Sequence, residues 1–474
     1  MDFDVLIVGL GPTGAVLAGL LAQAGRRVLA IDRDAQPFPQ PRAAHFDGET
    51  MQTFARLGIA GAAERESRPL AEYVFQAADG SDLMRFANRA QPGSRWQASY
   101  MFHQPAVEGA LREAIGLLPT LTISLSMALK AIVSNGPDGV RAILEGPDGP
   151  RNVTARYLVG CDGGSSPTRA TIGAGLDDYG FDEPWLVVDC LATDEADLPQ
   201  HGLQVCDPAR PTTVMPMSPL RRRWEFMLLP GETAQQALAD GFVERLLAPW
   251  GRPGQLTVVR KAVYRFHGLV AERWREGCVL LAGDAAHQMP PFMGQGLCSG
   301  VRDAANLAWK LDWVLTGRAP PALLDSYQTE REPHVRAIIE SAIAMGRMVC
   351  TLDPATAAAR DAAMKAGAPP PPIAPPRPGP GLFAEGEEGG YVACVAEAMT
   401  DARFLLLTLS GPLPDLPEGV VHRHIGAALP EGQWLNSRGA VAALVRPDGY
   451  VFGVGEAAAL IDALSAVLKR SEPA

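Results

Sequence analysis

The first apolar run of the chain covers residues 4–8, Asp-Val-Leu-Ile-Val, and predicts a buried β-strand. A glycine-rich turn follows it, and an Ala- and Leu-rich stretch to about Ala24 predicts a helix. A second apolar run at 28–31 ends in Asp32. A strand, a glycine turn, a helix and a strand in this order predict the first unit of a doubly wound parallel sheet.

Further along, the spacing of apolar residues in 104–115 predicts another helix. The runs 121–133 and 140–144 predict a strand meander, because Gly-Pro-Asp-Gly turns stand at 136–139 and near 146–149. The sheet is therefore expected to be mixed rather than purely parallel.

The pattern changes between about 180 and 275, where short alternating runs are separated by Pro and Gly. These runs predict a largely antiparallel sheet, and their ranges are 185–192, 212–217, 224–229 and 256–266. One helix is expected within this region, at about 233–247. A fully apolar strand returns at 278–282 and a long helix is expected at about 301–314, so the first domain is predicted to be discontinuous.

A Pro-rich stretch at 369–381 predicts an extended, semi-rigid linker. Beyond it the chain predicts a small α/β domain with a hairpin turn at 446–449; its strands are expected at 404–409, 440–445 and 450–454, and a closing helix at 457–468. The predicted division has four parts: a discontinuous domain, 1–178 with 276–345; an inserted domain, 179–275; a helix end and linker, 346–381; and a C-terminal domain, 382–474.

Charge narrows the classes of partner. The 474 residues include 42 Lys and Arg against 53 Asp and Glu, a net charge of −11, so the chain lacks the positive field that nucleic acid or an anionic membrane would require. The apolar runs are broken well before the ~18 residues of a membrane span. Residues 1–4 show no cationic leader, and we expect a cytoplasmic protein that binds neither nucleic acid nor membrane.

Seven cysteines stand far apart, an odd number with no Cys-x-x-Cys pair and no clustered His. This usage argues against disulfides, redox dithiols and structural zinc, and no metal is expected. The positions are Cys161, Cys190, Cys206, Cys278, Cys298, Cys350 and Cys394.

The turn after the first strand reads Gly9-x-Gly11-x-x-Gly14, and it is followed by a helix and by Asp32 at the end of the next strand. In this context the glycines allow a tight turn, close approach of a pyrophosphate, and packing of the helix on the strand. Asp32 would bind a ribose diol. The pattern predicts a dinucleotide site.

Two further strands end in acids. The segment 157–169 contains Asp162-Gly-Gly and then Ser166 and Arg169 at the start of a helix. The segment 279–296 contains Gly283-Asp284, a Pro/Gly loop and another helix. Each pattern places a carboxylate and glycines outside strand ends, where ligands bind in open α/β sheets.

In this order and spacing, the three motifs resemble those of the FAD-dependent single-component aromatic hydroxylases built like p-hydroxybenzoate hydroxylase. The segments 290–296, 302–310 and 222–226 look most like the subgroup containing 3-(3-hydroxyphenyl)propionate hydroxylase. The resemblance implies a Rossmann-like FAD-binding domain with a mixed parallel sheet, an inserted antiparallel substrate domain, and a thioredoxin-like C-terminal domain marked by the segment 445–451. Since Cys394 is the only cysteine of that last domain, it cannot cycle a dithiol, and a structural or oligomer-contact role is expected.

The resemblance also implies roles for individual residues. The glycines would meet the FAD pyrophosphate, Gln104 the ribityl chain, and the backbone at the start of the long helix the flavin ring. The full set expected to bind the cofactor is Gly9, Gly11, Gly14, Asp32, Arg33, Arg42, Gln104, Asp162, Gly283, Asp284, Pro291, Gly294, Gly296 and Leu297. Cys298 departs from the Asn of many relatives, and the preference for NADH or NADPH as transient electron donor is not readable.

The inserted sheet is expected to supply the substrate pocket. Strand alternation in 223–227 sends Trp224 and Phe226 to one face and Arg223 and Glu225 to the other, and the sequence does not say which face lines the pocket. The residues predicted to bind substrate are Met215, Trp224, Phe226, Pro290 and Phe292, with Met217 and His267 as further wall candidates. Those predicted to assist catalysis are His45, Arg223 and Tyr264. His287 is more simply a packed residue, and Trp309 and Trp313, one helical turn apart, are expected in the core.

The function implied is hydroxylation of a phenol such as 3-(3-hydroxyphenyl)propionate with NAD(P)H and O2, through a flavin C4a-hydroperoxide. Two alternatives remain: hydroxylation of a polycyclic polyketide or antibiotic, and an FAD-dependent reductase or dehydrogenase on the same fold. A non-enzymatic FAD-binding protein would leave the flavin motifs unexplained. The partners expected are a small aromatic substrate and O2, and a homodimer is compatible with this reading.

Overall fold

The computed structural model describes residues 1–37, 39–90, 94–239, 241–367, 377–384, 390 and 402–470. Residues 369–376 of the predicted linker, and Cys394, lie outside the described residues. Within the described part of the chain, no helix is both long and apolar enough to cross a membrane.

The first sheet is built on five parallel strands in the order β18-β11-β1-β2-β8. The strands are β1 (Phe3–Val8), β2 (Val28–Asp32), β8 (Leu121–Leu125), β11 (Gly149–Gly160) and β18 (Val279–Leu281). The antiparallel strands β9 (Ala128–Gly136), β10 (Gly139–Gly146) and β17 (Arg275–Glu276) complete it, so the predicted mixed sheet is confirmed.

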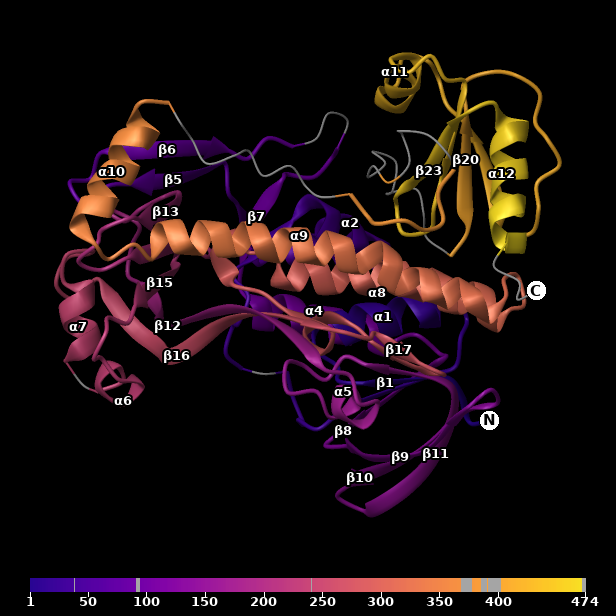
Figure 1. Cartoon of the computed structure of the whole chain (residues 1–474), viewed down its shortest axis with the longest axis horizontal. Coiled ribbons are helices and arrows are strands. Elements are labelled where there is room, and N and C mark those ends of the chain that lie inside the picture. The colour runs from indigo at the N-terminus through magenta and orange to yellow at the C-terminus, as the bar shows by residue number, and fades with distance from the viewer. Residues whose placement is uncertain are drawn as a thin grey trace.

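Two helices with apolar surfaces cover this sheet (Figure 1). In α1 (Pro12–Gln23) every residue from Gly14 to Ala22 is buried, because the helix packs both on the sheet and against α8 (Gly296–Leu315). The longer α9 (Asp325–Val349) runs beside α8 across the molecule, as Figure 1 shows, and carries Pro333 within it.

The second sheet is largely antiparallel, in the order β19-β16-β12-β15-β14-β13-β5-β6. Its strands are β5 (Glu72–Gln76), β6 (Asp82–Ala87), β12 (Leu176–Ala192), β13 (Gly202–Val205), β14 (Thr212–Pro216), β15 (Arg221–Met227), β16 (Leu256–Ala271) and β19 (His287–Gln288). The sheet extends beyond the segment 179–275, because β5 pairs in parallel with β13 and β19 pairs with β16.

The prediction of a single helix at about 233–247 is wrong in one respect. The structure has two short helices, α6 (Ala234–Ala237) and α7 (Phe242–Leu247), and the residue before α7 is Gly241 with φ of +81°. A left-handed glycine interrupts a helix, and here it lets α7 turn onto the sheet. A further helix, α10 (Pro354–Lys365), follows α9; Asp353 caps it by accepting a 2.7 Å hydrogen bond from the Thr356 amide.

Smaller elements connect the two sheets. A three-stranded sheet has β7 (Ser99–Phe102) between β3 (His45–Asp47) and β4 (Ser67–Pro69). The remaining helices of this part are α2 (Gly48–Arg56), α3 (Ala60–Arg65), α4 (Gln104–Gly116) and α5 (Pro167–Thr171), with short 3-10 turns η1 (Gly283–Ala285), η2 (Pro291–Met293) and η3 (Pro321–Leu324).

The C-terminal unit has the sheet order β21-β20-β22-β23, with one parallel and two antiparallel pairs. Its elements are β20 (Phe404–Thr408), β21 (Val420–His424), α11 (Pro430–Asn436), β22 (Ala442–Val445), β23 (Val451–Gly455) and α12 (Ala457–Arg470). Trp309 and Trp313 of α8 pack against Phe404, with ring centroids 5.5 and 5.1 Å apart, so their prediction as core residues is confirmed.

Candidate active site

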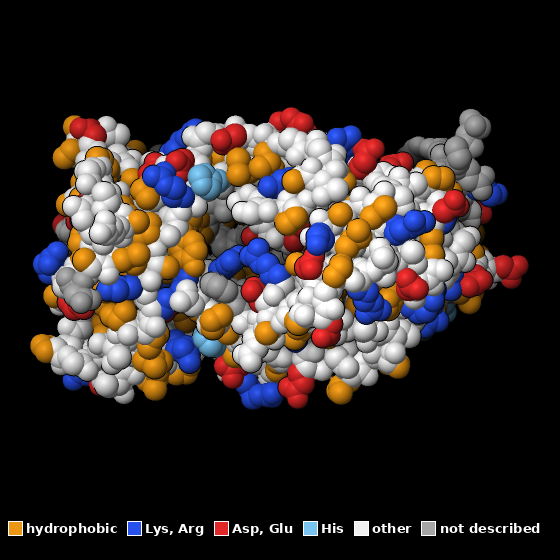
Figure 2. All heavy atoms as spheres, turned by 90° about the horizontal axis from the view of Figure 1, so that it is seen from below, with side chains coloured by type: hydrophobic (Ala, Val, Ile, Leu, Met, Phe, Trp, Pro, Cys, Tyr) orange, Lys and Arg blue, Asp and Glu red, His pale blue; other side chains and the backbone are white. Residues whose placement is uncertain are grey.

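A cavity of about 720 Å³ lies where the carboxyl ends of the first sheet meet one face of the second sheet. At one end, called here the glycine-turn end, it is lined by Gly11, Pro12 and Thr13. At the other, called the sheet end, it is lined by Tyr73, Gln204, Thr213, Met215 and Glu225. Figure 2 shows the surface hollowed between the part built on the second sheet and the rest of the molecule, with cationic and histidine side chains beside the hollow.

The glycine turn has the shape that a pyrophosphate requires. Gly9 has φ of +97°, and a Cβ there would stand 2.4 Å from the Cys161 carbonyl oxygen. A Cβ on Gly14 would stand 2.0 Å from the Gly9 carbonyl oxygen, so this position allows only glycine. A Cβ on Gly11 would meet nothing within 4 Å. Gly9 and Gly14 therefore serve packing, and Gly11 leaves open space at the start of α1, where backbone N–H groups favour an anion.

Asp32 supports this turn from the end of β2. Its carboxylate accepts hydrogen bonds from the Leu10 amide at 2.9 Å and the Asp34 amide at 3.0 Å. Arg33 beside it has a side chain that is 73% exposed, and it lies 4.0 Å from Asp34. The structure thus places Asp32 against the turn and Arg33 at the surface.

Gln104, the first residue of α4, holds the segment that contains Arg42. Its Oε1 accepts hydrogen bonds from the Arg42 and Ala43 amides, both at 2.8 Å. Arg223 of β15 holds the same segment from the other side by donating to the Pro41 and Arg42 carbonyl oxygens at 2.6 and 3.0 Å. Arg42, Gln104 and Arg223 all line the cavity.

Asp162 does not line the cavity, although Cys161 and Gly163 on either side of it do. Its carboxylate accepts hydrogen bonds from the Thr168 amide at 2.9 Å and the Thr168 hydroxyl at 2.7 Å, and it also accepts from Ser166. In this structure the side chain predicted to serve the cofactor supports the start of α5.

The third motif lies opposite the glycine turn. Asp284 lines the cavity and its side chain is open to it; the surrounding protein displaces part of the water around the carboxyl and raises its pKa, while His287 and Arg42 oppose the rise. Gly283, with φ of +62°, packs against Thr13 instead. The loop after them contributes Pro291, Phe292, Gly294, Gly296 and Leu297 to the lining, whereas Pro290 is buried behind it.

His45 fastens that loop rather than standing free in the cavity. Its Nδ1 lies 2.9 Å from the Gly294 carbonyl oxygen and its Nε2 lies 2.8 Å from the Ser99 hydroxyl. A carbonyl oxygen can only accept, so Nδ1–H donates to Gly294 and Nε2 accepts from Ser99 in the neutral ring. Burial lowers the pKa of His45, which favours this neutral form.

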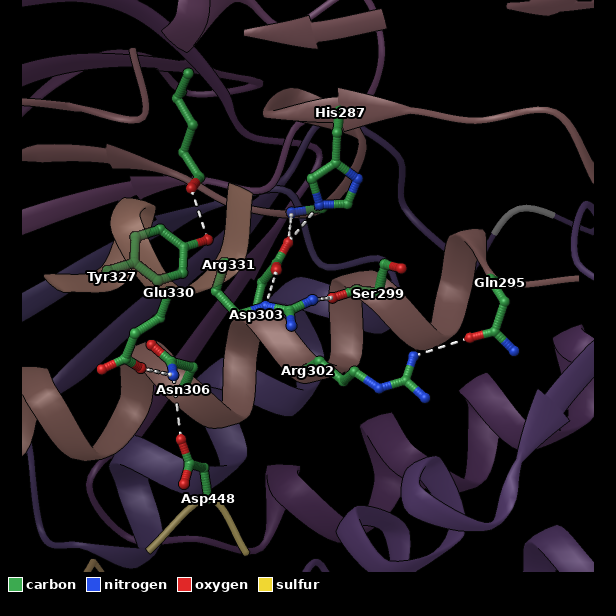
Figure 3. A network of polar contacts seen from close by, with 12 residues as sticks. His287, Gln295, Ser299, Arg302, Asp303, Asn306, Tyr327, Glu330, Arg331 and Asp448 are labelled. Carbon is green, nitrogen blue, oxygen red and sulfur yellow. Dashed lines mark hydrogen bonds and ion pairs between the residues drawn. The ribbon is translucent and has the colours of Figure 1, made fainter. Parts of the chain in front are cut away.

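His287 belongs to a buried ion cluster behind the cavity (Figure 3). Its Nε2 lies 2.6 Å from Asp303 Oδ2, and Arg331 Nε donates to Asp303 Oδ1 at 2.8 Å. Although burial acts in the opposite direction, the contacts with His287 and Arg331 lower the pKa of Asp303 to about 2. The side chain is buried and paired, consistent with a packed residue.

The polar face of β15, in the second sheet, is directed toward the cavity. Arg223 and Glu225 line it, while Trp224 and Phe226 point to the opposite face and pack beneath α7 with Val243 and Leu247. Placing Trp224 and Phe226 in the substrate pocket is therefore corrected, and the physical reason is that α6 and α7 cover their face. Met215 and Phe292 do line the cavity, as does His267.

Tyr264 and Met217 are likewise outside the lining. The Tyr264 hydroxyl accepts a hydrogen bond from Arg260, and Met217 borders a smaller cavity of about 310 Å³ on the other side of the Pro41 segment. A catalytic contact by Tyr264 has no support in this geometry.

Glu225 also lines the cavity, although the sequence pattern indicated only that it shares a strand face with Arg223. Burial raises the pKa of its carboxyl to about 6, with Asp189 adding to the rise and Arg223, 3.9 Å away, opposing it. It faces Thr213 across the strand pair, and Thr213 donates a 2.7 Å hydrogen bond to Gln204. The sheet end thus presents a carboxylate beside the Arg223 guanidinium, with neutral polar and apolar side chains around the pair.

These features fit FAD. The open space at Gly11, the amide of Gln104 and the acid at Asp284 supply groups for pyrophosphate and ribityl hydroxyls. The start of α8 has no side-chain cap, so its backbone N–H groups and its dipole favour negative charge on a ring bound there. Among the residues that the structure describes, no group of three or more His, Cys, Asp or Glu could hold a metal ion.

Comparisons with known proteins point the same way. A family model described as FAD binding domain matches residues 2–342. The chain is 39% identical over 500 residues to a probable NADH-specific resorcinol 4-hydroxylase of Rhodococcus jostii, across 98% of this chain and 94% of that protein. It is 38% identical over 361 residues to a 3-(3-hydroxy-phenyl)propionate/3-hydroxycinnamic acid hydroxylase of Mycolicibacterium smegmatis, across 76% of this chain but only 63% of that relative.

Solved structures share the whole fold. Anhydrotetracycline hydroxylase from Streptomyces rimosus aligns with a TM-score of 0.77 and 28% identity, covering 100% of both chains. Aklavinone-11 hydroxylase, solved with FAD and aklavinone, aligns with a TM-score of 0.78 and 26% identity, covering 99% of both chains.

Proposed function

This chain belongs to the FAD-binding family of flavoprotein aromatic hydroxylases, and on that premise we propose that it hydroxylates a small neutral phenol, resorcinol or a close analogue, using NADH and O2. The family membership rests on the match over residues 2–342 and on the relative aligned along nearly its full length. The choice of a neutral, single-ring phenol rests on the sheet end of the cavity.

The observation that carries the proposal is the Glu225 carboxylate. It is 7% exposed, lines the cavity, and has a pKa of about 6, so it is mostly ionised at neutral pH. A phenol hydroxyl can donate a hydrogen bond to it. The carboxylate of an anionic substrate placed at the same point would be repelled, since like charges at close range are costly where water is excluded.

The size of the cavity supports a substrate with one aromatic ring. The volume of about 720 Å³ spans both the glycine-turn end and the sheet end. Pockets of roughly 300–1,000 Å³ hold one drug-sized ligand. Since a dinucleotide must share this space, the part left at the sheet end suits a single aromatic ring.

When bound, FAD supplies the transfer of electrons from NADH and the activation of O2. The protein residues do the rest. Gly11 and the start of α1 would bind the pyrophosphate, and Gln104 and Asp284 would orient the ribityl hydroxyls. Glu225 would accept the hydrogen bond of the phenol hydroxyl, which increases electron density in the ring, and Phe292 and Met215 would exclude water.

The test uses purified holoenzyme with NADH and O2. Resorcinol is expected to accelerate flavin reduction and to yield 1,2,4-trihydroxybenzene in step with NADH consumed, with little free peroxide. Stimulated NADH oxidation that gives only peroxide with every single-ring phenol would contradict the proposal, and reduction of an added quinone or alkene without O2 would favour a reductase.

A second candidate substrate is 3-(3-hydroxyphenyl)propionate, because Arg265 and His267 also line the cavity and could pair with its carboxylate. Arg265 already donates to Asp182 at 2.6 Å. A kcat/KM higher for the propionate than for resorcinol, lowered by Arg265→Gln, would favour this candidate. A polycyclic phenol turned over faster than both would favour the class of substrate seen with the solved neighbours.

A further inference from the structure

The hairpin turn of the C-terminal unit carries polar side chains that are buried against the first domain. Arg446 Nη2 donates to Glu330 of α9 at 2.8 Å, and both side chains are fully buried. Asp448 accepts a 3.1 Å hydrogen bond from Asn306 of α8, a contact drawn in Figure 3. A turn that served only to join two strands would need none of these partners.

A third side chain of the same turn begins a chain of contacts that leads to the cavity. Tyr450 is 5% exposed, and its hydroxyl donates to Glu49 Oε1 at 2.8 Å. The other carboxylate oxygen, Glu49 Oε2, accepts from Arg302 Nε at 2.6 Å. Arg302 Nη1 then donates to Gln295 Oε1 at 2.9 Å, as Figure 3 shows.

Arg302 is held by two acids at once. Besides Glu49 it contacts Asp47, and despite burial these two acids raise the pKa of the guanidinium. Arg302 and the hydrogen bonds from Thr50 in turn lower the pKa of Asp47 to about 2, although burial opposes the change. Both acids follow His45 closely in the chain, and His45 bonds the Gly294 carbonyl. The cluster therefore connects β3 and α2 to the loop that precedes α8.

Gln295 is the residue directly before α8, and Gly296 and Leu297 after it line the cavity. Whatever fixes the Gln295 side chain also fixes the direction of the first N–H groups of α8. These N–H groups are the ones that would hold a bound flavin ring.

We propose that Tyr450 is a positioning residue for the flavin site: through Glu49 and Arg302 it fixes Gln295 and hence the first turn of α8. The C-terminal unit thereby takes part in the cofactor site without touching the cofactor. The proposal rests on the FAD-binding role of the loop but not on which phenol is hydroxylated.

The test compares Tyr450→Phe with Thr408→Val in purified holoenzyme. Thr408 lies in the same C-terminal unit, is 6% exposed, and bonds His422 at 2.8 Å, so its variant also loses one part-buried hydrogen bond but has no contact with the chain to Gln295. Tyr450→Phe is expected to shift the visible absorption bands of the bound flavin. It is also expected to raise the FAD dissociation constant, measured by ultrafiltration of diluted holoenzyme, about fivefold, the factor of one hydrogen bond. Thr408→Val is expected to leave both unchanged.

A double-mutant cycle identifies the route. Tyr450→Phe in a Gln295→Ala background should have no further effect on FAD affinity, because the route has already been cut. Additive effects would overturn the proposal, as would a Tyr450→Phe variant that loses thermal stability like Thr408→Val with unchanged flavin bands. If Tyr450→Phe does not fold, Glu49→Gln tests the same link and should give the same spectral shift.

These readouts need no phenol. A shifted flavin spectrum together with no hydroxylation of any phenol would leave this inference standing and reject the proposed substrate. Hydroxylation of resorcinol with an unchanged spectrum in Tyr450→Phe would do the reverse.

Discussion

Arg446 and Glu330 form an ion pair that neither residue exposes to water, although 116 positions separate them in the sequence. Lys310 adds a second cation 2.9 Å from Glu330, and burial lowers the pKa of Lys310 to about 8. The two parts of the chain are thus joined through balanced buried charge as well as through the tryptophans of α8.

Arg446→Met is expected to lower the free energy of unfolding by about 3–5 kcal/mol, because it leaves Glu330 and Asp448 buried without their shared cation. Chemical denaturation measures the loss. Arg318→Met is the matched control: its partner Glu418 at 2.9 Å is 81% exposed, and the buried Asp312, which Arg318 contacts at 3.4 Å, keeps Arg26 as a second cation at 3.1 Å. The same kind of change between the same two units should therefore cost about 0–1 kcal/mol. Equal losses in the two variants would contradict the prediction.

Gly11→Ala is expected to fold normally and to lose FAD. The new methyl group meets no protein atom within 4 Å, so the stability of the apoprotein should change by less than about 0.5 kcal/mol. The methyl group would stand in the space assigned to the pyrophosphate. The flavin content of the purified protein and the melting temperature of the apoprotein check both halves, and Gly14→Ala should instead fail to fold, given its 2.0 Å approach to the Gly9 carbonyl.

Glu225→Gln is expected to lower kcat/KM for the phenol about 100-fold at pH 8, since the variant cannot draw the proton of the hydroxyl. In the unchanged protein the rate should fall as pH drops below about 6, where the carboxylate becomes protonated. The variant should lack this acid limb. If the fall in rate near pH 6 persisted in the variant, the titration responsible for it would belong to another group.

The same substitution should stabilise the apoprotein at high pH. The pKa of Glu225 is raised in the folded protein, so folding favours its protonated form, and that contribution is full below about pH 4.5 and lost as pH rises through about 6. Gln carries no charge at any pH. Relative to the unchanged protein, Glu225→Gln should therefore gain about 1–2 kcal/mol between pH 4 and pH 8, measured by denaturation at both values.

Phe226→Leu tests the corrected placement of the apolar face of β15. The ring is 1% exposed and packs in the cluster beneath α7, so its loss should lower stability by about 1–3 kcal/mol. The KM for the phenol and the FAD content should stay unchanged. A raised KM with unchanged stability would return Phe226 to the substrate pocket.

Much of the cofactor end could be predicted from local sequence. The glycine turn, Gln104 and the Pro291–Leu297 loop each follow or precede a regular element, and the carboxyl ends of parallel strands meet at one edge of the sheet. Asp162 had the same local signature, yet its carboxylate accepts hydrogen bonds from the start of α5 instead of facing the cavity. Sequence spacing places a side chain at an edge but does not decide which neighbour it will bond.

The sheet end of the cavity was harder to predict from the sequence, for a physical reason. Alternation correctly separated Arg223 and Glu225 from Trp224 and Phe226, but which face is covered depends on where α7 folds back, and Gly241 decides that turn. Tyr73 reaches the cavity because β5 pairs with β13, a contact across more than a hundred residues that leaves no local pattern. The turn at Arg446 was predicted as a hairpin, but the pattern of a turn does not show what its side chains dock against.

The buried pair of Glu330 and Arg446 also has a consequence for biosynthesis. A ribosome adds about 5–20 residues per second, so Glu330 and Lys310 exist for on the order of ten seconds before their partners on the C-terminal turn are made. During that interval the face of α8 and α9 that will later contact the turn exposes these charged side chains to solvent. A chain stopped before residue 446 would keep that uncovered face permanently, and it would be marked for chaperones and proteases even with its glycine turn intact.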